Sequence, residues 1–160
     1  YRHEILTTEP LKPFLTPMVT VLGEGIYFSQ SMRGEIVGGM GDPDEPAGDR
    51  SGSSLDFVRR FARSATSLIT ALGNVQVVRQ WAGLYDVSPD GKPILGEPEA
   101  VPNMTLLAGF TGHGFMMAPI IGKLAAERLV RGTRVPYFDA HGPDRFQHGI
   151  ATNQESMIIG

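Results

Sequence analysis

The sequence predicts an α+β fold, in which an antiparallel sheet and one helix precede a unit made of a strand, a glycine-rich loop and a second helix. Short runs of strand-forming residues alternate with turn residues over the first forty positions. Amphipathic helix patterns cover residues 55–72 and the segment that ends near residue 131. Twenty glycines and twelve prolines, spread along 160 residues, suit short strands and tight connections better than a helical bundle.

The first forty residues are expected to be antiparallel. Strands are expected at residues 3–9, 19–22, 26–31 and 36–40. The last two runs flank a glycine-containing turn, which is typical of a β-hairpin. The polar segment 41–54 is rich in proline and glycine and is therefore expected to be a loop.

A helix is predicted next, because Ser53 and Asp56 have the form of a capping box and apolar residues follow on one face. Gly73 is expected to end this helix, and a strand is expected at residues 75–81. Pro89-Asp90-Gly91 predicts a turn, since proline presets φ and glycine supplies a positive φ.

The most distinctive segment joins the expected strand 104–108 to the last helix. It carries three glycines within six residues: Gly109, Gly112 and Gly114. A helix that begins directly after glycines exposes backbone N–H groups, which can hold a partial negative charge. Pro119 is then expected in the first turn, and Gly132 is expected to end the helix after Arg131. The alternative is a simple strand-to-helix turn that needs positive φ values.

Composition excludes several classes of function. A net charge of −3 argues against a nucleic-acid backbone as the main partner. No apolar run approaches the ~20 residues that cross a bilayer, and the first residues lack the form of a signal peptide. The absence of cysteine excludes disulfides and thiolate sites within this chain. His3, His141 and His148 show no metal-ligand spacing, so no metal site is predicted. These features predict a cytoplasmic protein.

The predicted elements do not complete a nucleotide-binding fold. No parallel partner is evident for the expected strand 104–108. The cluster Gly38-Gly39-Met40-Gly41 does not follow the G-x-G-x-x-G form, and no helix follows it at once. It is therefore not interpreted as a dinucleotide fingerprint.

Three motifs resemble the C-terminal third of the D-amino-acid-oxidase-like flavoprotein family. They are Trp81–Tyr85, Ser88–Gly96 and Ala108–Phe115. The chain looks most like the branch that contains sarcosine oxidase and its beta-type subunits, dimethylglycine oxidase and the beta subunit of dye-linked proline dehydrogenase. Further matching segments are Glu9–Pro13, Tyr27–Gly39 and Arg145-Phe146.

Members of this family begin with a β-α-β unit that holds the ADP half of FAD, and this sequence carries no such unit. The resemblance therefore implies the C-terminal part of an enzyme, with three portions. Residues 1–80 would be the antiparallel substrate-binding portion, and 81–132 would supply the closing strand and helix of the FAD-binding α/β domain. Residues 133–160 would be a surface tail. The expected partners are an N-terminal FAD-binding half or partner subunit and a small amine or amino-acid substrate.

FAD is the cofactor that the resemblance implies, bound at the glycine-rich loop. Gly112, His113 and Gly114 would present backbone N–H groups to the pyrimidine edge of the flavin, where reduction places negative charge. The side chain of His113 is expected to pack or to form a hydrogen bond rather than to titrate. The expected cofactor-binding residues are Gly109, Phe110, Thr111, Gly112, His113, Gly114, Phe115 and Met116.

Tyr85 is the expected catalytic side chain, because by resemblance it lies on the wall of the substrate cavity. Relatives that resemble glycine oxidase carry an arginine here, which holds the substrate carboxylate. Tyrosine instead favours secondary amines such as sarcosine, dimethylglycine or proline, with any carboxylate bound elsewhere. The alternative is a core tyrosine, and Tyr27 and Phe28 either line the same cavity or belong to the core.

Met116 stands where several sarcosine oxidases carry a lysine implicated in oxygen activation. Methionine favours a dehydrogenase that uses another acceptor, although Met116 and Met117 packing on the helix face is an equally compatible interpretation. The implied reaction is oxidation of a C–N bond by hydride transfer to flavin N5. The alternative function is a non-catalytic, flavoprotein-like subunit or an assembly factor of a respiratory or other multi-subunit complex.

Overall fold

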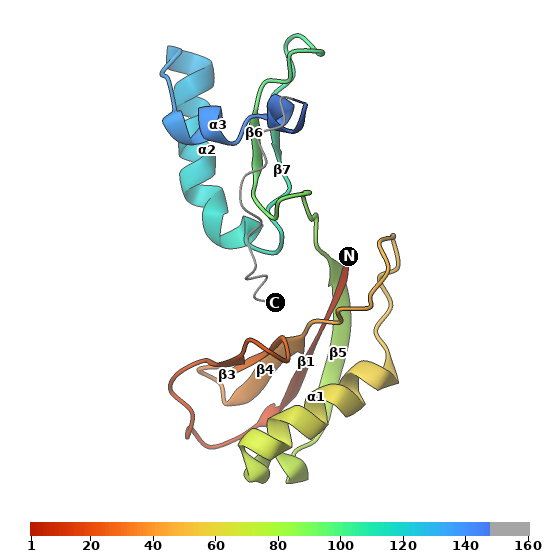
Figure 1. Ribbon diagram of the computed structural model, residues 1–160. Coiled ribbons are helices and arrows are strands. Elements are labelled where there is room, and N and C mark those ends of the chain that lie inside the picture. Colours follow the sequence, from red (N-terminus) through yellow and green to blue (C-terminus); the bar gives the residue numbers. More distant parts are fainter. Residues whose placement is uncertain (148–160) are drawn as a thin grey trace. The chain divides into compact units, whose positions relative to one another are not determined.

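Figure 1 shows the chain as a computed structural model, in which residues 1–147 are described. The chain divides into two compact units, and the boundary lies between Tyr85 and Asp86. The boundary expected after residue 80 falls inside strand β5, which continues to Leu84 in the sheet of unit 1. Asp86 therefore opens unit 2.

Unit 1 is a five-stranded sheet with helix α1 on one face (Figure 1). The strand order is β2-β3-β4-β1-β5, and every neighbouring pair is antiparallel. The strands are β1 (Arg2–Pro10), β2 (Val19–Val21), β3 (Ile26–Gln30), β4 (Glu35–Met40) and β5 (Val77–Leu84). The antiparallel arrangement predicted from the sequence is confirmed.

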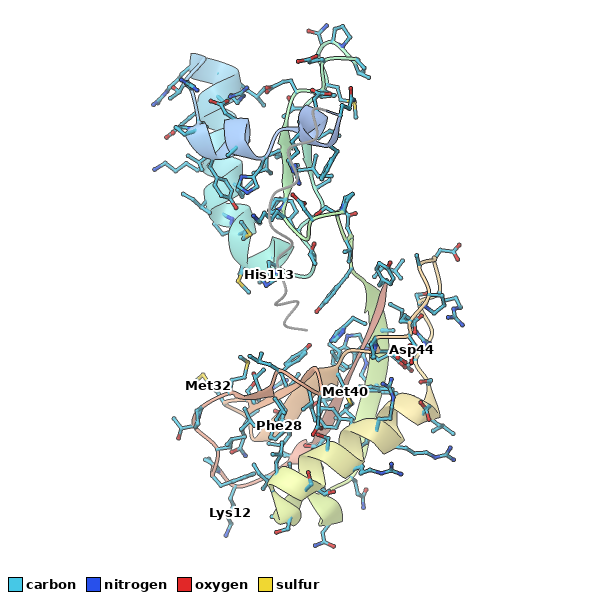
Figure 2. The ribbon with its side chains drawn as sticks, in the orientation of Figure 1. Lys12, Phe28, Met32, Met40, Asp44 and His113 are labelled. Carbon is cyan, nitrogen blue, oxygen red and sulfur yellow. The ribbon has the colours of Figure 1, made fainter. Side chains whose placement is uncertain are left out.

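The core of unit 1 lies between the sheet and α1. Phe28, labelled in Figure 2, is fully buried in this core. Its ring meets that of Phe61 of α1 edge to face, with the centroids 6.1 Å apart. Because successive strand residues point to opposite faces, Tyr27 lies on the other face of the sheet. A Cβ on Gly38 would lie 2.5 Å from the Cβ of Phe28, so this glycine serves packing.

Helix α1 (Leu55–Leu68) has its N-cap one residue later than the capping box predicts. The hydroxyl of Ser54 accepts the N–H of Phe57, so Ser54 and not Ser53 is the N-cap. The carboxylate of Glu4 accepts hydrogen bonds from the N–H and the hydroxyl of Ser54, which fixes the cap to β1. The helix also ends earlier than predicted, since Ile69 is extended, and a 3-10 turn, η1 (Thr70–Asn74), precedes β5.

Unit 2 contains a two-stranded antiparallel sheet and a long helix. Strand β6 (Ile94–Gly96) pairs with β7 (Leu106–Ala108), so the partner of the expected strand 104–108 is antiparallel and comes from within the chain. Helix α2 (Gly114–Arg131) ends at Gly132, whose φ of 64° confirms the predicted C-terminal glycine. The prediction for Pro119 is wrong, because Pro119 is the sixth residue of α2 and lies beyond the first turn. The missing N–H leaves the carbonyl of Phe115 without its helical donor, at a residue that is almost fully exposed.

The segment after α2 is not a surface tail within the described residues. It forms α3 (Pro136–Ala140) and the 3-10 turn η2 (Pro143–Phe146). Val135 and Phe138 are buried against Leu95 and α2, which gives this short segment an apolar anchor that its weak periodicity did not reveal.

A buried ion pair holds the same segment to the Pro89-Asp90-Gly91 turn. The guanidinium of Arg145 donates two hydrogen bonds to Asp90, at 2.9 and 3.1 Å, and further bonds to three backbone carbonyls. Both side chains are more than nine-tenths buried. Gly91 has the predicted positive φ, so the turn forms as expected and its aspartate also pairs with a cation. Within residues 1–147, no helix has the length and apolar character needed to span a membrane.

Candidate functional site

The glycine-rich loop of unit 2 joins β7 directly to α2. Three of its residues have positive φ values: Gly109 at 68°, Thr111 at 50° and Gly112 at 87°. The first and last of these are glycines, which adopt such angles without steric cost. His113 then takes a helical conformation and caps α2 without a hydrogen bond from its side chain to the helix (Figure 2).

Four backbone N–H groups at the start of α2 have no acceptor among residues 1–147. They belong to Gly112, Gly114, Phe115 and Met116. The N–H groups of His113 and Met117 are already used, since they bind the carbonyls of Phe110 and His113. A helix N-terminus carries about half a positive charge, so these groups form a site that suits a partly negative acceptor.

The side chains of the loop leave these amides accessible. His113 is half-buried, and its Nδ1 lies 3.3 Å from the carbonyl oxygen of Phe110. Phe115 is 98% exposed and Met116 is 72% exposed. Met117 packs on the core of unit 2, whereas Met116 does not. The alternative that both methionines pack the helix face therefore holds for Met117 alone.

Thr111 is the strained residue of the loop. It is 1% exposed, and a β-branched residue with a φ of 50° is energetically unfavourable. Its N–H donates to the backbone carbonyl of Asp86 at 3.0 Å, and its hydroxyl donates to the carbonyl of Gly109 at 3.3 Å. These two hydrogen bonds stabilise a backbone conformation that is unfavourable for an isolated threonine.

Asp86 holds the other end of the loop. Its Oδ2 accepts the N–H of Gly109 at 2.6 Å, and the next residue, Val87, forms a β-bridge with Phe110. Asp86 was not among the site residues predicted from the sequence. A carboxylate directly after Tyr85 was the available signal, but its partner lies 23 residues further along the chain.

Tyr85, the expected catalytic residue, is part of an aromatic cluster in unit 1. The cluster consists of Tyr85, Tyr27 and His3. The His3 ring stacks on Tyr85 with centroids 4.8 Å apart, and on Tyr27 with centroids 5.8 Å apart. The Nε2 atom of His3 lies 3.3 Å from the hydroxyl of Tyr27. The sequence pattern around His3 shows no metal-ligand spacing and gives no sign of this stacking.

Burial controls the ionisation of this cluster. Desolvation lowers the pKa of His3 to about 4, so the imidazole is neutral at pH 7. Burial also raises the pKa of both tyrosines, and for Tyr27 the neighbouring Tyr85 raises it further. The hydroxyls of Tyr27 and Tyr85 interact, and both phenols stay protonated at neutral pH. The cluster is therefore an uncharged set of hydrogen-bonding groups.

Gly39 provides the space that the cluster occupies. A Cβ at this position would lie 2.7 Å from both His3 Nε2 and the hydroxyl oxygen of Tyr27. No real Cβ tolerates such distances without a displacement of its neighbours. The second glycine of the Gly38-Gly39 pair thus serves the aromatic cluster, and the first serves the core.

Comparison with known proteins identifies relatives that cover most of this chain. The DAO family model, described as FAD dependent oxidoreductase, matches residues 1–128. Over 154 residues the chain is 34% identical to the sarcosine oxidase subunit beta of Rhizobium meliloti (strain 1021), covering 96% of this chain and 36% of that protein. Over 128 residues it is 27% identical to FAD-dependent oxidoreductase domain-containing protein 1 of Xenopus laevis, covering 77% of this chain and 26% of that protein.

Among solved structures, L-proline dehydrogenase from P. horikoshii superposes with a TM-score of 0.83 and 35% sequence identity. The match covers 92% of this chain and 40% of that one. The α+β fold predicted for a part of such a protein is confirmed. The chain spans less than half the length of each of these three relatives.

Proposed function

Because the chain belongs to the DAO family of FAD-dependent oxidoreductases, we propose that it forms the C-terminal part of an enzyme that oxidises the C–N bond of a secondary amine or amino acid. Its similarity to a sarcosine oxidase subunit and to L-proline dehydrogenase supports substrates of the sarcosine, dimethylglycine or proline type. The relatives are more than twice as long, so an N-terminal FAD-binding half or a partner subunit would supply the rest of the fold.

The observation that carries the proposal is the set of four unpaired N–H groups at the start of α2. FAD is the cofactor of this family, and its flavin supplies the hydride acceptor of the reaction. The amides of Gly112, Gly114, Phe115 and Met116 fit the pyrimidine edge of a flavin, where negative charge develops on reduction. Donors that are fixed before the reaction stabilise such charge without reorganisation.

Tyr85 is proposed to contact the substrate. Its phenol is half-buried and remains protonated at neutral pH, so it can donate one hydrogen bond and accept another. His3 of the neighbouring strand β1 stacks on the Tyr85 ring, and Tyr27 of β3 stacks on His3 in turn. A neutral side chain here favours an uncharged amine, from which a hydride can leave without a strong base.

Met116 gives an indication of which molecule reoxidises the flavin. Its exposed thioether supplies no positive charge beside the loop, which supports a dehydrogenase that passes electrons to an acceptor other than oxygen. Slow reoxidation of the reduced enzyme by air in stopped-flow measurements is the expected result. Rapid reoxidation would contradict this part of the proposal.

The test uses the chain purified together with the polypeptide that completes the fold. Flavin absorbance that bleaches on addition of sarcosine, dimethylglycine or proline is expected. Gly112→Val should abolish flavin retention, because it places a branched side chain at a φ of 87° beside the amides. Gly48→Val is the control, since Gly48 is exposed and a Cβ there meets nothing within 4 Å.

Tyr85→Phe should lower kcat/KM while flavin content stays unchanged, because it removes only the hydroxyl group. Unaltered kinetics would exclude Tyr85 from the substrate site. A preparation that stays colourless with its partner polypeptide present would instead favour a non-catalytic subunit or an assembly factor.

A further inference from the structure

We infer that Asp86 is a positioning residue for the flavin-binding loop and that its carboxylate lowers the reduction potential of the bound flavin. The inference rests on the proposed function, because it requires a flavin at the start of α2. It concerns a residue that lies outside the loop in the sequence and is joined to it by two hydrogen bonds.

The first step is the pairing between Asp86 and the loop. The carboxylate of Asp86 accepts the N–H of Gly109 at 2.6 Å, and its backbone carbonyl accepts the N–H of Thr111 at 3.0 Å. Between these two contacts, Phe110 pairs with Val87 in a β-bridge. Asp86 therefore binds the first and the last residue of the segment 109–111.

The N–H groups of the loop fall into two sets, those that are already hydrogen-bonded within the chain and those that are not. Those of Gly109 and Thr111 are occupied by Asp86, and that of His113 binds Phe110. The amides of Gly112 and Gly114 have no acceptor within residues 1–147. By occupying the earlier amides, Asp86 sets which donors are left for a ligand.

The backbone of the loop is strained at Thr111. Thr111 has a φ of 50° although it is β-branched, a conformation that persists only when its surroundings impose it. The hydrogen bond to the Asp86 carbonyl is one of the contacts that impose it. The Asp86 side chain adds a second restraint through the N–H of Gly109, two residues before Thr111. Loss of that restraint should let the loop shift, and the amides after Thr111 should then move with it.

The charge of the Asp86 carboxylate would also affect the reduction of a bound flavin. Reduction adds negative charge to the flavin edge, and the start of α2 favours that charge. The carboxylate of Asp86 is an opposing negative charge at the same loop. Removing this charge while keeping a hydrogen-bond acceptor should make the flavin easier to reduce.

The experiment compares Asp86→Ala with Asp86→Asn in the enzyme that contains the completing polypeptide. The affinity for FAD is measured by fluorescence titration, and the reduction potential by equilibration with redox dyes. Asp86→Ala should weaken FAD binding roughly tenfold or more, because a charge-assisted hydrogen bond is lost. Asp86→Asn should bind FAD almost as wild type, because its amide oxygen can accept the Gly109 N–H, and should have a higher reduction potential.

Asp144→Ala is the matched control, since Asp144 also accepts a backbone N–H, that of Glu99, at 3.0 Å within unit 2. Wild-type FAD affinity in Asp86→Ala would overturn the positioning role, and an unchanged potential in Asp86→Asn would overturn the electrostatic role. Flavin retention by Gly112→Val would overturn the proposed function itself. Loss of flavin in Gly112→Val with normal Asp86 variants would overturn this inference alone.

Discussion

At the scale of single residues, His3 is the buried ionisable group of the aromatic cluster. It is 6% exposed, and its ring lies against two tyrosines whose phenols are neutral at pH 7. Desolvation lowers its pKa from 6.5 to about 4. Between these values the unfolded chain binds a proton that the folded chain does not, so stability must fall as the pH is lowered through this range.

We therefore expect the stability of the folded chain to become less pH-dependent in His3→Gln. The lowered pKa corresponds to about 3 kcal/mol that is present above pH 6.5 and is lost by about pH 4. Glutamine cannot titrate but can still bind the hydroxyl of Tyr27. Chemical denaturation at pH 7.5, 6, 5 and 4 measures the difference between the two proteins. An identical pH slope for wild type and His3→Gln would contradict the burial of a neutral imidazole.

The backbone conformation of the glycines could be predicted from the sequence, whereas contacts between residues far apart in the chain could not. Gly112 and Gly132 adopt the positive φ values that glycine permits, as local reading anticipates. His3 and Asp86 act through partners 24 and 23 residues away, and these distances are set by the fold. The pattern Gly38-Gly39 was the available signal for the aromatic cluster, because adjacent glycines within a strand indicate a close approach of other groups.

At the scale of elements, Arg145 joins the last turn of the described chain to the loop that precedes β6. Its pair with Asp90 is buried, bidentate and supplemented by backbone carbonyls. Breaking a buried pair from one side leaves an uncompensated charge, so Arg145→Ala should destabilise unit 2 by about 3–5 kcal/mol. Arg134→Ala is the control, because Arg134 is 83% exposed in its pair with Asp139 and should have little effect. Thermal unfolding of both variants measures the difference, and equal losses of stability would refute it.

Element positions were predicted better than element ends. All four strands expected in the first forty residues exist, and their alternation places Phe28 in the core. The cap of α1 moved to Ser54, since Glu4 reaches that residue from another strand. Strand β6 was not predicted, because three residues are too few for a periodic pattern and β7 determines their pairing.

At the scale of the whole molecule, the described chain exposes apolar side chains on one helix and one strand of unit 2. They are Leu107, Phe115, Met116, Ile120, Leu129 and Val130, each at least 40% exposed. Single exposed apolar residues are ordinary, but five on one helix predict that another protein segment covers α2. The sequence predicted a completing polypeptide through its resemblance to longer flavoproteins, but it did not predict which side chains of α2 are exposed, because exposure depends on the packing of the whole unit.

The completing polypeptide is therefore expected to cover this surface. The chain alone should bind the dye ANS and self-associate, and addition of the N-terminal FAD-binding half should suppress both, because apolar area is removed from water. Val130→Glu should weaken this assembly, since Val130 is 82% exposed at the end of α2 and a charge there would have to be buried. Met32→Glu is the matched control, because Met32 is fully exposed in the hairpin turn of unit 1. Light scattering and titration calorimetry follow the assembly. If Val130→Glu and Met32→Glu assembled equally well with the completing polypeptide, the apolar face of α2 would not be its binding surface.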